Sequence, residues 1–189
     1  METLREHAHQ LRLVKPESDL RVVARWRERL AVLADSKGNV AHATLALHNT
    51  RPLYDAESRH VLEDLLSHHL NQFLLKFELE PQPSGFVFAH GHLLLPWEPE
   101  ALNFLKGMWA YGAKEVRLTY KGEKLPSALS RVRSFVDIPD LSPLEAFFSF
   151  RDSTIAVLRS SDDLARYLAK RTFVGGLPPL IKRFPKRSA

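Results

Sequence analysis

The sequence predicts an α+β domain with a single β-sheet, and it also allows a mixed α/β arrangement. Two observations predict this class. Segments with the two-residue alternation of strands and segments with the helical spacing of apolar residues follow each other in mixed order. The 189 residues, 44% of them hydrophobic, are enough for one core, and no shift in composition divides them. We therefore expect one domain over residues 1–176, followed by an extended basic tail over residues 177–189.

The first predicted element is an N-terminal β-hairpin. Residues 30–35 and 40–47 are apolar enough to form strands, and the Ser-Lys-Gly-Asn segment 36–39 between them favours a tight turn. The preceding segment, residues 18–34, also allows a helix. Its apolar residues recur at nearly helical spacing, at Leu20, Val23, Trp26 and Leu30.

A long central helix is the clearest predicted element, from about Ala56 to Leu79. Asp55 suits its N-cap, because a carboxylate there accepts hydrogen bonds from the free N–H groups of the first turn. Pro81 and Pro83 would end the helix, since proline lacks the N–H group that continues it. A wide apolar stripe predicts packing against a sheet and consists of Val61, Leu62, Leu65, Leu66, Leu70, Phe73, Leu74 and Phe77.

The second half of the chain alternates between strands and two shorter helices. Gly112 supplies a helix stop, and Ser160 or Ser161 supplies a helix cap. The predicted elements are a strand over 86–95 in which Gly91 allows a break, a helix over 100–111, a strand over 115–120, a short helical piece over 127–135, a strand over 154–158 and a helix from 160–161 to about 171.

Positive charge is concentrated at the C-terminal end of the chain. The whole chain has 27 Lys and Arg against 22 Asp and Glu, a net charge of +5. No acidic residue follows Asp163, so without residues 164–189 the balance becomes 20 against 22, or −2. The seven basic residues of this segment are Arg166, Lys170, Arg171, Lys182, Arg183, Lys186 and Arg187.

Such an acid-free segment predicts binding to a polyanion. Cationic side chains neutralise phosphates and release counterions, and an aromatic ring among them, Phe184, can stack on an unpaired base. We therefore expect a nucleic-acid-binding, non-catalytic accessory or assembly subunit whose contacts are Phe184 and these seven cations. One alternative is a protein–protein adaptor that docks on an acidic partner.

A second alternative is a phosphodiester-cleaving enzyme. His42-Ala-Thr44-Leu45, on a predicted strand, resembles the His-x-Thr-hydrophobic motif that two-histidine phosphoesterases carry in two copies. The resemblance implies histidines that act as general acid and base and threonine hydroxyls that hold a phosphate. The best second copy, His90-Gly-His92-Leu, has no Thr or Ser two places after either histidine. The alternative therefore depends on His42, Thr44 and either His90 or His92.

Two sets of residues raise the question of a metal site. His90 and His92 share one side of a strand, and His42 would be a third ligand if its strand were adjacent, but no acidic residue lies beside either motif. The second set is a row on the predicted central helix, which an ordinary polar helix face also explains: His60, Asp64 and His68. Because each set is incomplete, we predict no metal and no cofactor.

The composition excludes several classes of protein. The chain has no cysteine, which excludes disulfides, thiolate zinc sites and cysteine nucleophiles. It also lacks the glycine-rich patterns of phosphate-binding loops and the Gly-x-Ser-x-Gly pattern of serine hydrolases. No segment is long and apolar enough to span a bilayer, and the first residues do not resemble a secretory signal, so we expect a cytoplasmic protein.

Overall fold

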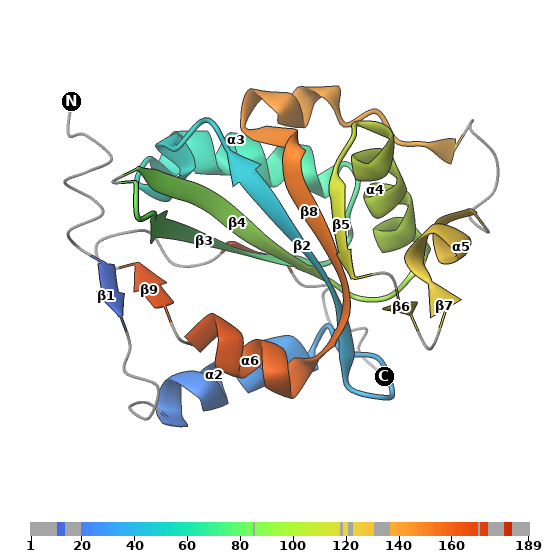
Figure 1. Ribbon diagram of the computed structural model, residues 1–189, viewed down its shortest axis with the longest axis horizontal. Helices are drawn as coiled ribbons and strands as arrows, with labels where there is room; N and C mark the ends of the chain where they lie inside the picture. Colours follow the sequence, from blue (N-terminus) through green and yellow to red (C-terminus); the bar gives the residue numbers. More distant parts are fainter. Residues whose placement is uncertain are drawn as a thin grey trace.

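The computed structural model describes residues 11–13, 20–84, 86–117, 119–120, 123–130, 137–169, 171–173 and 180–182. The predicted α+β class with one main sheet is confirmed (Figure 1). The elements are β1 (Leu11–Leu13), α2 (Leu20–Ala31), β2 (Asn39–Leu47), η1 (Arg51–Leu53), α3 (Ala56–Ser67), β3 (Phe73–Pro81), β4 (Val87–Leu95), α4 (Pro99–Ala110), β5 (Lys114–Arg117), β6 (Thr119–Tyr120), β7 (Glu123–Lys124), α5 (Leu125–Ser130), η3 (Ser142–Ala146), β8 (Phe148–Ser160), α6 (Ser161–Ala169), β9 (Arg171–Phe173) and β10 (Leu180–Lys182).

The main sheet has six strands in the order β10-β3-β4-β2-β8-β5. Its first four neighbouring pairs are antiparallel, and β5 runs parallel to β8 at the far edge. The segment Leu180–Lys182 therefore forms an edge strand, although it belongs to the predicted tail. Two small antiparallel ladders, β1-β9 and β6-β7, lie outside this sheet.

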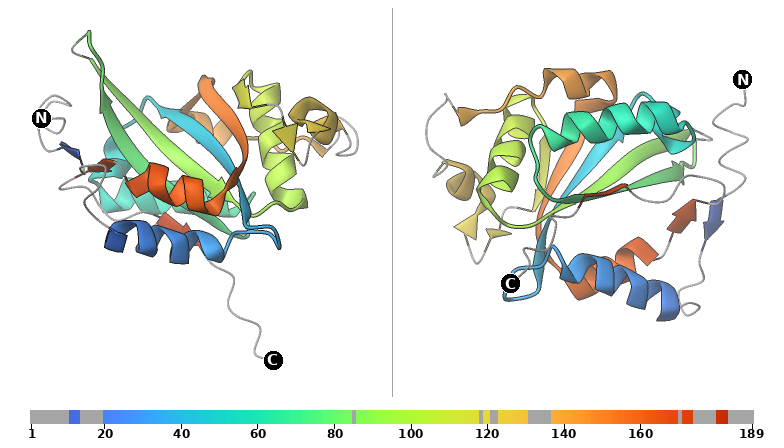
Figure 2. Two further views of the ribbon diagram at one scale, coloured as in Figure 1. Left: turned by 60° about the horizontal axis from the view of Figure 1, so that its bottom comes forward. Right: turned by 180° about the vertical axis from the view of Figure 1, so that it is seen from behind.

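Helices cover both faces of the main sheet. α3 and α4 lie against one face, which carries the larger apolar core with buried Leu62, Phe77 and Phe104. α2 and α6 lie side by side against the other face and form a smaller core that includes Trp26 and Leu168 (Figures 1 and 2). The buried sheet face beneath α6 is therefore the place where side chains of the central strands meet helical residues.

The predicted N-terminal hairpin is wrong. Its first half is the end of α2 and the following turn, and β2 pairs with β4 and β8 instead. The helical alternative is correct, because the spacing of Trp26 and Leu30 places both side chains in the core with α6. The turn chemistry still operates: Gly38 has φ +75°, and the Asp35 carboxylate accepts from the backbone N–H groups of Lys37 and Asn39.

The predicted central helix is correct in its first half and wrong in its second. Asp55 caps α3 as expected, with its side chain accepting from the Ser58 N–H, but the helix ends at Ser67. Residues from Phe73 onward form β3, because apolar and charged residues alternate there. One face of β3 enters the larger core, through Phe73, Leu75, Phe77 and Leu79, and the other carries Leu74, Lys76 and Glu78.

β4 does not break at Gly91, since it pairs continuously with β3 from Val87 to Leu94. The glycine has a packing role: a Cβ atom at this position would lie 2.7 Å from Leu75 Cδ1.

The predicted helix over 100–111 corresponds to α4, and Gly112 follows it with φ +91° as a helix stop. The strand predicted over 154–158 is the middle of the longer β8. The last predicted helix is α6, and the piece predicted over 127–135 overlaps α5.

Candidate functional site

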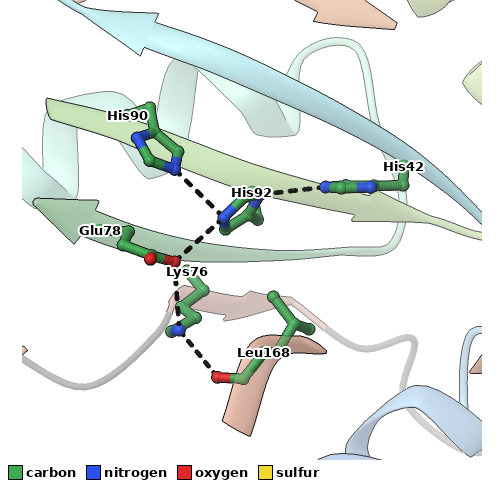
Figure 3. A network of polar contacts seen from close by, with 6 residues as sticks. All are labelled: His42, Lys76, Glu78, His90, His92 and Leu168. Carbon is green, nitrogen blue, oxygen red and sulfur yellow. Dashed lines mark hydrogen bonds and ion pairs between the residues drawn. The ribbon is translucent and has the colours of Figure 1, made fainter. Parts of the chain in front are cut away.

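Three central strands place polar side chains on the sheet face beneath α6. Strand register aligns His92 of β4 with Lys76 of β3, and His90 with Glu78. On the other side of β4, Thr44 of β2 is aligned with His92, and His42 lies two residues earlier on the same face. Residues that are paired or two apart share a face, so these side chains lie on the same side of the sheet. Figure 3 shows the side chains of the three histidines, Glu78 and Lys76 close together.

The three histidines and Glu78 form one chain of contacts, which we call the histidine cluster. His42 Nε2 lies 3.0 Å from His92 Nδ1. His92 Nε2 lies 3.1 Å from Glu78 Oε2 and 3.2 Å from His90 Nε2. All four side chains are buried, with relative exposures of 5% or less. His92 is therefore the centre of the cluster, and both of its ring nitrogens are in use.

Burial sets the charge state of the cluster. Desolvation lowers the pKa of His42 and His92 and lowers that of His90 to about 4, and the neighbouring histidines act in the same direction on His42 and His90. Burial alone would raise the pKa of Glu78, but the His92 hydrogen bond and the Lys76 charge outweigh it and lower the pKa to about 2. At neutral pH the cluster therefore holds neutral imidazoles around an ionised carboxylate.

Lys76 and α6 close the cluster on the helical side. The Lys76 ammonium lies 3.5 Å from Glu78 Oε2 and donates to the Leu168 carbonyl oxygen of α6 at 2.8 Å. The Tyr167 ring meets the His92 ring edge-on at 5.3 Å between centroids. Arg159 of β8 lies over the same tyrosine, with Cζ 5.0 Å from the ring centroid. The helix that carries Arg166 thus also covers the histidines.

The fold brings together the residues of the enzyme alternative, His42, His90 and His92, with Thr44 in register beside them. Their arrangement does not favour an acid–base pair on a phosphate. Such a pair must face a substrate from two sides, whereas His42 and His92 are buried and in direct contact with each other. The cluster is better suited to holding something small, such as a proton or a single ion.

The other possible metal ligands from the sequence, His60, Asp64 and His68, do not form a comparable group. His60 and Asp64 lie 3.6 Å apart on the exposed side of α3, and His68 is the C-cap residue of that helix. Within the described part of the chain, the one group of at least three His or acidic side chains with metal-ligand spacing is Glu78, His90 and His92.

Glu78 was not predicted as a site residue, because the sequence pattern assigned it to the central helix. The alternation of Lys76, Glu78 and Glu80 with apolar residues was the signal for a strand.

The predicted nucleic-acid contacts are only partly described. Arg166 is exposed on α6, where its guanidinium lies 3.4 Å from Asp162 Oδ2. Arg171 and Lys182 belong to β9 and β10. The other predicted contacts lie outside the described residues: Lys170, Arg183, Phe184, Lys186 and Arg187.

The structure adds basic residues that sequence analysis did not consider. α2 has four arginines and one glutamate, and it packs beside α6. Arg21 and Arg25 are exposed, Arg27 pairs with Asp162, and Arg29 lies over the Trp26 ring at 5.1 Å. We call α2 and α6 together the basic layer. The signal for it was the low acid content of residues 20–31, where the sequence was interpreted only through the spacing of its apolar residues.

Comparison with protein-family models, curated proteins and solved structures found no match. Among the helices that the structure describes, none has the length and apolarity needed to cross a membrane. The basic layer and the histidine cluster are therefore the features of the molecule from which a function can be inferred.

Proposed function

We propose that this protein binds nucleic acid as an accessory or assembly subunit, through the basic layer and the C-terminal cations. The observation that carries the proposal is the exposed arginine pair of α2, Arg21 and Arg25, beside α6 with its exposed Arg166. Arginine is suited to this role because its planar guanidinium donates two parallel hydrogen bonds to a phosphate.

The α2 arginines form a regular row of positive charge. Arg21, Arg25 and Arg29 follow one another at four-residue intervals and so lie along one side of the helix. Each step advances about 6 Å along the helix axis, from a rise of about 1.5 Å per residue. Arg29 is half-buried against Trp26, so the two exposed members are the ones that we assign to phosphates.

Charge is distributed unequally over the two helical layers. In the basic layer, α2 carries four arginines and a single acid, and α6 carries Arg166 with Asp162 and Asp163, which makes five arginines against three acids. On the opposite face of the sheet, α3 carries Glu57, Glu63 and Asp64, and its one arginine, Arg59, is buried. A polyanion is attracted to the first face and repelled by the second. This asymmetry supports an orientation in which the basic layer faces the nucleic acid. The C-terminal cations would add to the positive charge of the protein.

Substitution of the exposed arginines tests the proposal. Labelled single- and double-stranded DNA and RNA oligonucleotides are titrated with the wild type and with an Arg21→Gln/Arg25→Gln variant at about 0.1 M salt. Loss of two phosphate contacts should weaken binding by about tenfold or more, because counterion release scales with the number of contacts. The matched control is Arg51→Gln/Lys114→Gln, which removes two exposed cations from other parts of the surface and should change affinity little.

The C-terminal contribution needs a truncation that leaves the sheet intact. Removal of residues 177–189 would also remove β10, which pairs with β3. A chain that ends after Lys182 keeps this strand and loses Arg183, Phe184, Lys186 and Arg187. It should bind more weakly than the full chain. Equal affinity of the arginine variant, the truncated chain and the wild type would contradict the proposal, and capture of an acidic protein instead would favour an adaptor.

A further inference from the structure

We propose that Glu78, His90 and His92 bind one divalent transition-metal ion of the zinc class, with His42 as the outer partner that orients His92. Each of the three residues offers one ligand atom from a buried side chain, and these three atoms lie within 4.8 Å of one another. The site is independent of the surface proposed for nucleic acid.

Two of the three distances between these ligand atoms are close to the edges of a tetrahedral metal site. Zinc binds imidazole nitrogen and carboxylate oxygen at about 2.0–2.2 Å, so two ligand atoms on a tetrahedral ion lie about 3.3–3.5 Å apart. The observed separations are 3.1 Å between His92 and Glu78 and 3.2 Å between His92 and His90. These two separations would widen by a few tenths of an ångström around an ion, and the ligand atoms of Glu78 and His90, which lie within 4.8 Å of each other, would both bind the same ion. Two histidines and one glutamate leave a fourth position for water.

Hydrogen bonds alone cannot supply a separate donor for each of the close contacts at His92 Nε2. A neutral imidazole has a hydrogen on one of its two nitrogens. If His92 donates its Nε2 hydrogen to Glu78, that hydrogen must also serve the contact with His90 Nε2. If His90 donates to His92 instead, two lone pairs face each other at the 3.1 Å contact between His92 and Glu78. A cation accepts all three lone pairs at once, which removes the conflict.

The ligand atoms suit a transition ion. Two buried imidazoles offer ring nitrogens, and buried Glu78 offers a carboxylate oxygen. Imidazole nitrogens favour zinc and its neighbours, whereas Ca²⁺ and Mg²⁺ prefer sites made of oxygen. The ligand set therefore selects a transition ion.

His42 should raise the affinity of the site for a metal, and Lys76 should lower it. A metal on His92 Nε2 leaves the His92 hydrogen on Nδ1, which then donates to His42 Nε2 at the observed 3.0 Å. Metal-bound histidines usually make such an outer hydrogen bond, and its removal costs about 10–100-fold in affinity. Lys76, 3.5 Å from Glu78 Oε2, is a cation already beside the anionic ligand and competes with the metal for it.

Metal titration of variants tests the assignment. The protein is prepared without a histidine tag, stripped with a chelator and titrated with Zn²⁺ against a chromophoric chelator, and Co²⁺ is used to record the visible spectrum. The wild type should bind one Zn²⁺ per chain. Glu78→Gln, which preserves shape, should lose more affinity than His42→Gln, for which a loss of about 10–100-fold is expected. Lys76→Met should bind at least about tenfold more tightly, because the competing cation is gone.

A matched control uses histidines outside the cluster. The exposed pair His60 and His68 can be replaced in a His60→Gln/His68→Gln variant that should bind like the wild type. A wild type without stoichiometric Zn²⁺ binding at micromolar concentration overturns the proposal, whatever the variants do. So does a loss of binding in the control variant, or an unchanged affinity in folded Glu78→Gln. If a variant fails to fold, the Co²⁺ spectrum of the wild type still decides, because a tetrahedral nitrogen and oxygen site gives strong visible bands.

Discussion

Acidification of the metal-free protein should reduce its stability through the histidine cluster. His90 has a pKa of about 4 in the folded chain because of burial, against an ordinary value of 6.5. Between these values the unfolded chain takes up a proton that the folded chain does not bind. The stability is therefore complete above about pH 6.5 and is lost as the pH falls towards 4.

The size of this effect follows from the difference in pKa. One pKa unit corresponds to about 1.4 kcal/mol, so His90 alone should cost about 3 kcal/mol once the loss is complete. His42 and His92 have lowered pKa values from the same cause and add to the loss. Glu78, with a pKa of about 2 in place of 4.5, contributes only at lower pH.

Urea unfolding at several pH values between 7 and 4.5, with a chelator present, measures this loss directly. The free energy of unfolding of the wild type should fall by about 2 kcal/mol or more over this range. His90→Gln should show a smaller fall, and the exposed control His60→Gln should follow the wild type. A free energy that stays constant down to pH 4.5, or an equal fall in His90→Gln, would refute the account of a neutral buried cluster.

Two further predictions concern packing. Gly91→Ala should destabilise the protein by about 1–3 kcal/mol, because the added methyl group would lie 2.7 Å from Leu75 Cδ1; the cost measured by urea unfolding should shrink in a Leu75→Ala background, and an unchanged cost would contradict the contact. Leu30→Ala should cost about 2–5 kcal/mol, because Leu30 is fully buried between α2 and α6. A change below 1 kcal/mol would show that residues 20–31 do not pack as this helix.

Local patterns predicted the fold class and several elements but not the elements with competing signals. Asp55, Gly112 and Ser161 lie at helix boundaries where capping chemistry is strong, and there sequence and structure agree. Around Leu30 and Phe73 short apolar runs satisfy both helical and strand patterns. Tertiary packing decided between them: α6 stabilises α2 as a helix, and pairing with β4 and β10 makes residues 73–81 a strand.

The histidines of the candidate site could be predicted from the sequence, but Glu78 could not. The sequence groups His42, His90 and His92 if their two strands are adjacent, and β2 does pair with β4. Glu78 comes from β3, which the sequence pattern had merged with the preceding helix. Its role depends on the register that aligns it with His90, and register is a property of the assembled sheet.

The salt dependence of binding tests the proposed function most directly. The slope of log affinity against log salt concentration counts the phosphates contacted, at about 0.9 per contact for duplex and about 0.7 for single strands. For the preferred oligonucleotide, Arg21→Gln/Arg25→Gln should lower the magnitude of the slope by about 1.4–1.8 relative to the wild type. Equal slopes for the two proteins, or no measurable binding of any oligonucleotide by the wild type at low salt, would contradict nucleic-acid binding by the basic layer.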